Sequence, residues 1–544
     1  MNRRHFLQTA SIAALAPTFT WGAGSPEDTK QAQPKRWLRL AEKLKPTLHE
    51  TPVIPRTIVN PIADSARFLR WRMGAVSPAS ALRERVMRNG DTVVLDFGEY
   101  LTGHLVFSVI GAAGTVDSPV RIKFTFGEVP AEVAESFDHY KGGLSRSWLQ
   151  DEVINIDVVP STIQLPRRYS FRYLKIEIAA ISSSYTVRFS DLRAIAITSA
   201  GRNQRPLPQA TPDLLRRIDE VSLNTLRNCM QTVFEDGPKR DRRLWIGDVR
   251  LQALANYDTF RNNDLVKRCL YLFAGLPRED GFMPSCIYER PSAQSGHIYI
   301  IDYAALYVVL LLDYAQATKD WRTARDLWPV ARRQIEILTQ YVGKDRIFEA
   351  PKGSWVFVDW KDGLDRTAAM HAIFVFSLRK AVELAREVGA DAEAAEYSKR
   401  IKELTTTARS AFFDSAQKVF VSGAQKQVSW ATQAWMILSE IATPAEGAAA
   451  VRVVLNLPEA VRPGGPYLYH YFVEATIKCG LKAEALEMVQ GYWGGMVQAG
   501  ADTFWEVYDP ANPMLSPYGD PLINSYCHAW SCTPAYLFRS GGLF

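Results

Sequence analysis

Helical periodicity dominates the second part of this chain. About twelve segments place apolar residues at i, i+3 and i+4 spacing, which is typical of helices with one buried face. They cover residues 212–234, 247–260, 265–274, 302–318, 321–342, 366–388, 391–413, 430–441, 444–455, 467–479, 483–497 and 527–538. No internal sequence repeat relates them. Antiparallel helices in this number suit a closed (α/α)6 toroid, whose loops rather than helices carry the functional residues.

The residues before this region change to short β-rich runs. From residue 51 to about residue 197, β-branched and aromatic residues alternate with polar ones, in runs such as VRIKFTFGE and YLKIEIAAI. Turn signals at residues 111–114 and 117–119 separate several of the runs. The pattern predicts an antiparallel β-sandwich over residues 51–200. A polar, proline-containing joint follows at residues 201–208, so we expect the helical domain over residues 205–544.

The N-terminal residues resemble an export signal. Residues 1–24, MNRRHFLQTASIAALAPTFTWGAG, place paired arginines before a weakly apolar stretch that ends in small residues. We expect a twin-arginine signal and therefore a periplasmic or secreted protein. The apolar stretch is too short for a membrane span, and Pro17 interrupts it. Residues 25–50 are polar and contain prolines, and we expect them to form an irregular lead or a short helix.

Charge and cysteine content argue against several classes of function. The 64 basic and 58 acidic residues give a net charge of +6 without a long basic run, so nucleic acid is not an expected partner. Six cysteines do not make a disulfide scaffold in a chain of this length, and Cys527 and Cys532 have poor geometry for pairing if both lie on one helix. No second ligand cluster accompanies them, so we expect no structural metal and no cofactor.

Residues 236–248, DGPKRDRRLWIGD, are too polar to be hidden in a core. They contain three carboxylates, three arginines, a lysine and a tryptophan. Gly237 and Pro238 predict a turn after Asp236. Asp248 falls near the start of the next helix, where a carboxylate also caps free N–H groups. Two interpretations follow: a site that binds a polar ligand, or a surface salt-bridge cluster with a helix cap.

Two further segments share this polar and aromatic character. They are residues 500–506, GADTFWE, and residues 525–530, SYCHAW. In the same chain order, the three segments resemble the signature of the α-L-rhamnosidases of glycoside hydrolase family 78. There an Asp, an Arg with acidic residues and Trp-x-Gly-Asp line the sugar pocket, Gly-Ala-x-Thr-x-Trp-Glu carries the general base, and a His contacts substrate.

This resemblance implies both a fold and an activity. The fold is a β-sandwich followed by an (α/α)6 toroid. The activity is that of an exo-acting, inverting glycoside hydrolase, which removes terminal α-L-rhamnose from oligosaccharides, polysaccharides or glycosides. Such an enzyme needs a carboxylic acid that protonates the leaving oxygen and a carboxylate that activates a water on the other face of the sugar.

Glu506 is the expected general base under this resemblance, and Asp241 is the expected general acid. Counted back from Trp245 and Asp248, Asp241 stands where the family usually has its catalytic Glu. Counted forward from Asp236, it matches the aspartate just before that Glu. Either Asp241 is the acid on a shorter side chain, or another residue has taken this role.

The remaining expected site residues bind the sugar. Carboxylates accept hydrogen bonds from its hydroxyl groups, and aromatic side chains face its methyl group. Residues 355–360, WVFVDW, resemble the family's Gly-Asp-Trp loop with Val358 in place of the glycine, and Asp302 opens a helix after a loop that contains His297 and Tyr299. The expected substrate-binding residues are Asp236, Arg240, Trp245, Asp248, Asp302, Asp359, Trp360, Trp505 and His528.

The basic cluster Lys239, Arg240, Arg242 and Arg243 has two interpretations. It is either a set of solvated cations at a helix end, or the binding site for an acidic sugar next to the rhamnose, such as a uronic acid. Cations beside Asp241 would also favour its ionised form, whereas a general acid must keep its proton.

Two other functions are compatible with these residues. One is another (α/α)6 carbohydrate enzyme, a hydrolase or a lyase, that acts on glycans containing uronic acid. The other is a catalytically inactive sugar-binding protein, in which Asp in place of Glu has disabled the acid. Only sixteen residues follow His528, so we do not expect the family's common C-terminal β-sandwich.

Overall fold

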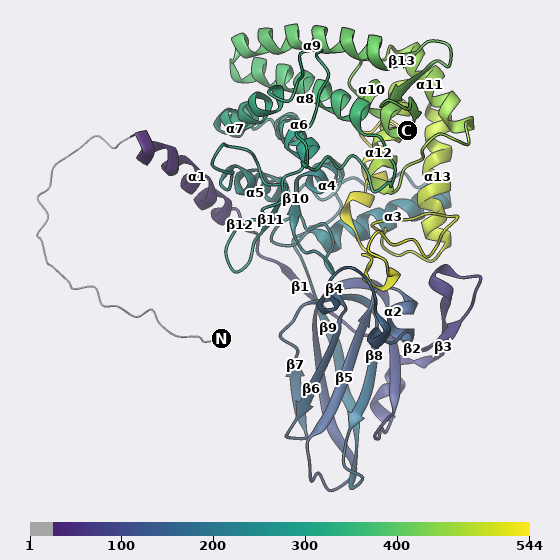
Figure 1. The fold of residues 1–544 in the computed structure, drawn as a ribbon. Coiled ribbons are helices and arrows are strands. Elements are labelled where there is room, and N and C mark those ends of the chain that lie inside the picture. Colours follow the sequence, from purple (N-terminus) through teal and green to yellow (C-terminus); the bar gives the residue numbers. More distant parts are fainter. Residues whose placement is uncertain (1–25) are drawn as a thin grey trace, which may run out of the picture.

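Strands and helices separate into two domains along the chain. The computed structural model describes residues 26–544, and Figure 1 shows a β domain packed against one side of a larger helical domain. The predicted fold class is confirmed in its order, with antiparallel strands first and helices after them. The signal expected at residues 1–24 lies outside the described residues. Among residues 26–544, no helix combines the length and the apolar character that a membrane crossing requires.

Nine antiparallel strands make up the β domain, connected in one hydrogen-bonded network. In sheet order, β1, β9, β4, β8, β5 and β6 follow one another, while β2 and β7 pair with β4, and β3 pairs with β2. The strands are β1 (His49–Val53), β2 (Thr57–Ala63), β3 (Trp71–Pro78), β4 (Thr92–Gly114), β5 (Val120–Gly127), β6 (Asp151–Ile156), β7 (Ser161–Gln164), β8 (Tyr169–Ala180) and β9 (Tyr185–Thr198).

The long strand β4 connects the parts of this domain. Its first residues pair with β2 and β8, and its last residues pair with β9. The register shifts between Asp96 and Leu101, where Gly98 has a φ of +83°, a conformation that favours glycine. Alternating side chains such as Phe107 on β4 and Phe124 on β5 are fully buried, and they form the core that the period-two pattern predicts.

The helical domain contains eleven helices of two turns or more after residue 212, and one shorter helix. They are α3 (Asp213–Cys229), α4 (Ile246–Asp258), α5 (Asn263–Ala274), α6 (Ile301–Thr318), α7 (Trp321–Thr339), α8 (Thr367–Val388), α9 (Asp391–Phe412), α10 (Trp430–Leu438), α11 (Pro444–Asn456), α12 (Pro466–Lys478), α13 (Lys482–Gln498) and the short α14 (Pro534–Leu537). The loops contain two small three-stranded sheets, one of β10 (Leu244–Trp245), β11 (Cys286–Tyr288) and β12 (Gln294–Ser295), the other of β13 (Phe413–Asp414), β14 (Val419–Ser422) and β15 (Gln427–Val428).

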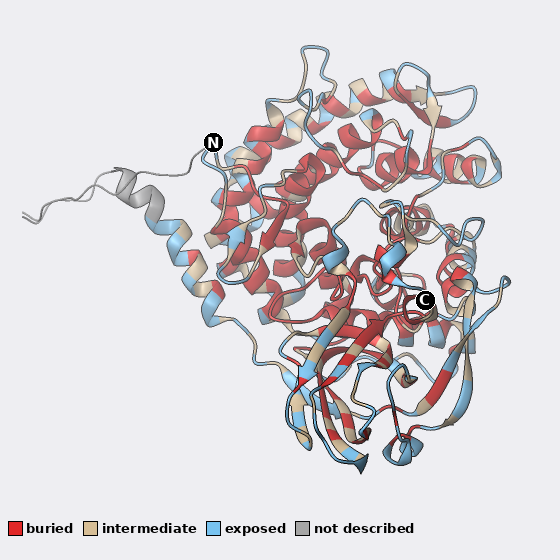
Figure 2. Ribbon diagram, turned by 60° about the horizontal axis from the view of Figure 1, so that its bottom comes forward, coloured by how far each residue is buried: buried red, intermediate tan, exposed pale blue. Residues whose placement is uncertain are grey.

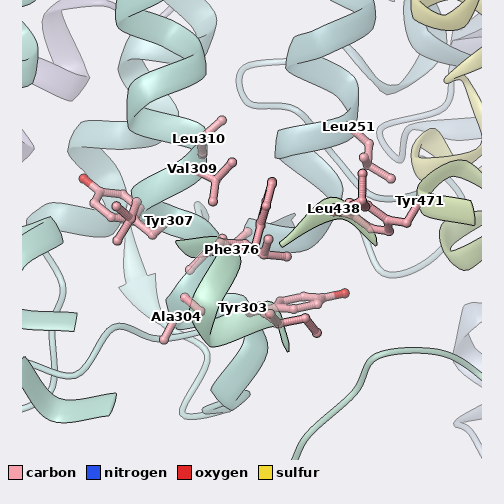
Figure 3. Close-up of a cluster of buried hydrophobic side chains, with 14 of the residues drawn as sticks. Leu251, Tyr303, Ala304, Tyr307, Val309, Leu310, Phe376, Leu438 and Tyr471 are labelled. Atoms are coloured by element: carbon pink, nitrogen blue, oxygen red, sulfur yellow. The ribbon is translucent and has the colours of Figure 1, made fainter. Parts of the chain in front are cut away.

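The helices form an inner ring and an outer ring. Helices α4, α6, α8, α10 and α12 contact one another in that order, and the C-terminal segment with α14 closes the ring between α12 and α4. Residues 301–312 of the inner helix α6 are all buried, and apart from Asp302 their side chains are apolar or aromatic around the whole circumference. Figure 2 shows this buried interior, and Figure 3 shows side chains of the inner helices packed together, among them Tyr303, Phe376 and Tyr471.

The last predicted helix, residues 527–538, is wrong in extent. A 3₁₀ turn at Ala529–Ser531 and the single turn of α14 stand in its place. Pro534 begins α14, where proline suits a helix start but would break a helix that arrived from residue 527. His528 before them is extended, with φ −133° and ψ 123°. The SYCHAW segment is therefore extended at His528 and does not follow a helix axis.

Most of the lead is helical. Helix α1 (Pro26–Lys43) is longer than the short helix that we considered, and it packs on α5. Trp37 and Ala41 of α1 are buried, and Trp37 Nε1 donates to Asp326 of α7 at 3.2 Å. Two anchored side chains one turn apart explain why a polar, proline-containing stretch is ordered here.

A buried ion-pair cluster joins the two domains. Lys239 precedes α4 in the helical domain, and Glu128 and Glu132 follow β5 in the β domain. Lys239 Nζ lies 2.9 Å from Glu128 Oε2 and also pairs with Glu132, and the three side chains are at most 2% exposed. Glu128 also accepts hydrogen bonds from Tyr100 Oη and from the Tyr526 amide, each at 2.7 Å. The cluster therefore ties the β domain to two distant parts of the helical domain.

Replacing Lys239 by Met tests this junction. The variant leaves two buried carboxylates without their cation, which typically costs about 3–5 kcal/mol. We expect the free energy of unfolding, measured by urea denaturation at pH 7, to fall by that amount. As a control, Arg217→Ala removes a cation whose partner Glu220 is 55% exposed, and it should change stability by no more than about 0.5 kcal/mol. Equal effects of the two variants would contradict a special role for the buried cluster.

Candidate active site

A cavity of about 250 Å³ opens where the loops of the inner helices meet the β domain. Residues from five distant parts of the chain come together there. They are Leu144, Trp148, Asp236, Arg240, Asp241, Arg243, Trp245, Asp248, Ile298, Ile300, Tyr303, Trp355, Phe357, Trp360, Glu506, Tyr518, His528 and Trp530. Four carboxylates and a histidine stand on one part of the lining, and indole and phenyl rings form most of the rest. This mixture suits a ligand with several hydroxyl groups and an apolar face.

Asp236 organises the turn that the sequence predicted after it. Its Oδ1 accepts the amide N–H of Arg243 at 3.0 Å, and its Oδ2 accepts that of Asp241 at 3.3 Å. Gly237 allows the chain to approach the C-terminal segment closely, because a Cβ there would lie 2.4 Å from Ser525 Oγ. The Asp236 carbonyl in turn accepts the Ala529 amide at 2.7 Å. The turn and the segment around His528 are therefore fixed to each other.

Glu506 is held by three donors and is only 3% exposed in its side chain. Arg240 Nη2 donates to its Oε2, and the Ser525 amide approaches the same oxygen at 3.4 Å. Tyr518 Oη donates to its Oε1. Burial by itself would lower the pKa of Arg240, but the negative charge of Glu506 outweighs it and the pKa is raised. Arg240 is thus a permanent cation beside Glu506.

Asp241 shares this cation with Glu506. Its Oδ1 lies 3.5 Å from Arg240 Nη1, and its Oδ2 lies 3.5 Å from Arg243 Nη1. Its side chain is 18% exposed, whereas that of Glu506 is almost fully buried. Asp241 is therefore the more accessible of the two carboxyl groups, and Arg240 lies next to both.

Burial changes the protonation of the other polar groups. Burial first, and the charge of Asp241 second, raise the pKa of Asp236 to about 8. The pKa of Asp248 is raised well above its ordinary value by burial and then by the charges of Asp236 and Glu506. Burial and the nearby Arg240 lower the pKa of His528 well below its ordinary value, so its imidazole is neutral. The cavity therefore offers a neutral imidazole and two carboxyl groups that hold their protons more tightly than usual.

Several buried polar atoms on this lining have no hydrogen-bond partner within residues 26–544. They are Asp248 Oδ1, His528 Nδ1, Arg243 Nε and Trp360 Nε1. Asp248 Oδ1 and His528 Nδ1 lie 3.7 Å apart, too far for a hydrogen bond to each other. Buried groups without partners are costly, so a ligand with hydroxyl groups or water would be stabilised by them.

Three of the residues expected to bind substrate lie outside the cavity lining. Asp302, in the first turn of α6, accepts the amides of Phe357 at 2.8 Å and Val358 at 3.1 Å. Asp359 Oδ2 accepts the Gly464 amide at 2.5 Å. Trp505 stacks on Phe68 of the β domain at 3.9 Å between ring centroids. Their neighbours on the lining, Tyr303, Trp360 and Glu506, face the cavity instead.

The loop at residues 355–360 has a strained backbone. Val358 has a φ of +53°, in the left-handed region that favours glycine. This is the position at which the resembling family loop has glycine. The two hydrogen bonds to Asp302 hold the loop in this conformation, so Asp302 shapes the wall that Phe357 and Trp360 present.

The basic cluster is mostly used inside the protein. Lys239 pairs with Glu128 and Glu132, and Arg242 donates to the carbonyls of Lys239 at 3.2 Å and Arg168 at 3.1 Å. Arg240 pairs with Glu506, as described above. Arg243 stacks on the ring of Tyr288 at 4.4 Å and reaches the cavity. The interpretation as solvated cations at a helix end is therefore wrong for Lys239 and Arg240, which are buried, while Arg242 is half-buried.

Sequence patterns did not point to all of the lining. Trp530 lies within the segment 525–530 that we singled out, and Tyr303 stands next to Asp302, but neither was among the expected substrate-binding residues. Tyr518 lies in a loop of prolines and glycines with no periodicity. Leu144 and Trp148 belong to the β domain, where no pattern connects them to a site that begins at Asp236.

Cysteines and acidic groups form no metal centre within the described chain, where no group of three or more His, Cys, Asp or Glu side chains is placed to hold an ion. All six cysteines are free. Cys527 lies nearest to Cys229, with 3.8 Å between the sulfur atoms, and it is not paired with Cys532.

Two family models match the chain. The N-terminal domain of glycosyl hydrolase family 78 α-rhamnosidases matches residues 55–196, and the six-hairpin glycosidase domain of bacterial α-L-rhamnosidases matches residues 209–540. The two matches divide the chain between the β domain and the helical domain. No curated protein sequence matches the chain.

Solved structures are similar over most of the chain. A rhamnosidase from Klebsiella oxytoca with rhamnose bound is 44% identical, with a TM-score of 0.90 over 93% of this chain and 98% of that chain. A family 78 rhamnosidase of Bacillus sp. GL1 is 23% identical, with a TM-score of 0.71 over 86% of this chain and 49% of that chain. An α-L-rhamnosidase of Streptomyces avermitilis in complex with L-rhamnose is 16% identical, with a TM-score of 0.64 over 91% and 44% of the two chains. The last two show likeness of fold alone.

Asp236→Asn should change how stability depends on pH. Asp236 binds its proton more tightly in the folded chain, where its pKa is about 8, than in the unfolded chain, where it is near 3.8. Its stabilising neutral form is fully present below pH 3.8, and the contribution is lost as the pH rises through 8. Between pH 5 and pH 9 the free energy of unfolding should therefore fall less in the variant than in the wild type.

Urea denaturation at the two pH values measures this difference. Asn keeps one acceptor oxygen but loses the other, so we expect a loss of stability at both pH values, and only the change between them tests the claim. Asp213→Asn makes the same chemical change at a side chain that is 95% exposed, and it should follow the wild type. If the free energy of unfolding of Asp236→Asn changed with pH as that of the wild type does, this would contradict the raised pKa of Asp236.

Proposed function

The chain belongs to the α-L-rhamnosidases of glycoside hydrolase family 78, and from this premise we propose that it removes terminal α-L-rhamnose by an inverting mechanism with Asp241 as acid and Glu506 as base. That it is a glycoside hydrolase follows from the family. One observation carries the rest of the proposal: both carboxyl groups line the same cavity, next to the same guanidinium of Arg240.

Asp241 suits the acid because it is accessible from the cavity. It would donate its proton to the glycosidic oxygen as the bond to the leaving group breaks. Its cationic neighbours lie 3.5 Å away, longer than a charge-assisted hydrogen bond, so neither guanidinium is bonded directly to its oxygens. The raised pKa of Asp236, whose Oδ2 accepts the Asp241 amide, keeps a further negative charge away at neutral pH.

Glu506 suits the base because its position is fixed by its three donors. In an inverting enzyme the base activates a water on the face of the sugar opposite to the leaving group, and the two carboxyl groups stand roughly 6.5–9.5 Å apart to make room for that water. Arg240 would stabilise the carboxylate before reaction. We assign the water to the space between Glu506 and the sugar.

The rest of the lining would bind one sugar ring. Among the described residues Asp248 Oδ1 and His528 Nδ1 have no partner, so they can bond hydroxyl groups, and the raised pKa of Asp248 favours its protonated form. Trp245, Phe357 and Trp360 supply an apolar wall for the C6 methyl group of rhamnose. A cavity of about 250 Å³ is small for an oligosaccharide, which favours release of a terminal residue.

The sugar next to the terminal rhamnose and the cellular location of the enzyme are two further parts of the proposal. If an acidic sugar precedes the rhamnose, Arg243 is the cation to bind it, because its Nε has no partner among the described residues and it reaches the cavity. The arginine pair and apolar stretch in residues 1–24 support export to the periplasm or beyond.

Hydrolysis of p-nitrophenyl α-L-rhamnoside, compared with other p-nitrophenyl glycosides, tests the activity. Glu506→Gln should lower kcat on that substrate by about 10²–10⁴-fold, because Gln cannot take a proton from water, while rhamnose binding measured by calorimetry stays nearly unchanged. Glu487→Gln, the same change at an exposed position of α13, is the control. Near-normal turnover in the position 506 variant would remove Glu506 as the base.

Asp241→Asn separates the acid from other roles. A leaving group with a low pKa, such as p-nitrophenol, departs without much help, whereas the hydroxyl of a second sugar needs a proton. We expect a loss of about 10²–10⁴-fold in kcat on a rhamnose-containing disaccharide and a much smaller loss on the p-nitrophenyl rhamnoside. Asp236→Asn should affect both substrates alike. Equal losses for Asp241→Asn would place the acid elsewhere.

A further inference from the structure

A segment of the β domain reaches into the active-site cavity. Residues 140–148 connect β5 with β6, and Leu144 and Trp148 line the cavity. In Figure 1 the yellow C-terminal loops lie against this side of the β domain. The contact is made by the backbone: the Gly143 amide donates to the Tyr518 carbonyl at 2.7 Å, and the Lys141 amide donates to Asp520 at 3.3 Å. The segment therefore holds the loop that carries Tyr518.

Tyr518 contacts both Glu506, the proposed base, and Arg240, the cation beside it. Its hydroxyl donates to Glu506 Oε1, and the Arg240 guanidinium lies over its ring at 4.3 Å. The edge of the ring meets Trp360, with 6.0 Å between centroids. Burial, and then the charge of Glu506, raise the pKa of Tyr518 well above its ordinary value, so the hydroxyl stays a donor at every working pH.

The two oxygens of Glu506 are not equivalent. Oε2 faces two donors, Arg240 and the Ser525 amide, whereas within residues 26–544 Oε1 accepts from Tyr518 alone. Each carboxylate oxygen has room for about two hydrogen bonds. Oε1 therefore keeps one acceptor position for a water, and the Tyr518 hydroxyl determines the direction in which that position points.

We propose that Tyr518 is a positioning residue for Glu506, which aims Oε1 at the attacking water, and that the β-domain segment 140–148 holds Tyr518 in place. The inference rests on the proposed role of Glu506 as base. It makes the β domain a working part of the active site rather than a separate sugar-binding module.

Tyr518→Phe removes the hydroxyl and keeps the ring over Arg240. We expect kcat on p-nitrophenyl α-L-rhamnoside to fall by about 10–100-fold, since small misplacements of a catalytic group have effects of this size, with rhamnose binding within about threefold of the wild type. Tyr508→Phe is the matched control, because Tyr508 lies on the same loop, outside the cavity lining, and it should turn over like the wild type. Wild-type turnover in Tyr518→Phe overturns the inference.

Gly143→Pro tests whether the β-domain segment 140–148 holds Tyr518 in place. Proline has no N–H to donate to the Tyr518 carbonyl, so we expect a loss of about 3–10-fold in kcat with rhamnose binding retained. Wild-type turnover in this variant overturns the part of the inference that concerns the β domain.

Crystal structures of Tyr518→Phe and of the wild type decide whether Tyr518 positions Glu506, and they require no substrate. A Glu506 carboxylate that has rotated or moved supports positioning, and one in its wild-type orientation overturns it. Should the wild type hydrolyse no rhamnoside, the proposed function fails, and this structural comparison still decides whether Tyr518 positions Glu506.

Discussion

Arg240 balances the charge of a buried site, and much of the structure depends on it. A carboxylate taken out of water is unstable unless a cation or several N–H donors face it. Arg240 meets that need for Glu506 directly and for Asp241 at 3.5 Å, and its Nε donates to the Ile523 carbonyl at 3.0 Å. One side chain thus connects the turn after Asp236 with two segments more than 250 residues later. Among the described residues, Arg240 is also the cation that pairs with the buried Glu506.

Lys239 and Arg240 are neighbours in sequence, and their side chains contact different parts of the structure. Lys239 extends to the buried glutamates of the β domain, whereas Arg240 extends to the cavity. The β domain is therefore anchored two residues before Asp241, the proposed acid. Its segment 140–148 then returns to the cavity from the other direction, through Leu144, Trp148 and the contact with Tyr518. Both connections make the position of the β domain part of the geometry of the site.

Local patterns predicted the elements well where one physical rule decided them. The apolar spacing predicts a helix over residues 302–318, and α6 runs from Ile301 to Thr318, because nearly all of that helix is buried. Residues 527–538 show the limit of the same rule. Their apolar spacing also fits a helix, but Pro534 and tertiary bonds such as that from the Ala529 amide to Asp236 favour an extended start and a short turn. Apolar spacing indicates which side chains are buried, but it does not indicate which groups the backbone forms hydrogen bonds with.

The sequence alone determined the order of the two domains, the twelve-part helical pattern and the three polar segments that supply Asp236, Asp241, Asp248, Glu506 and His528 to one cavity. Residue type and local spacing suffice for these features. Only the tertiary structure decided that Asp302 supports a loop while Tyr303 faces the cavity, that Lys239 belongs to the domain junction, and that Tyr518, Leu144 and Trp148 complete the lining. Those roles depend on which distant groups share a low-dielectric space, and no local pattern in a chain encodes that proximity.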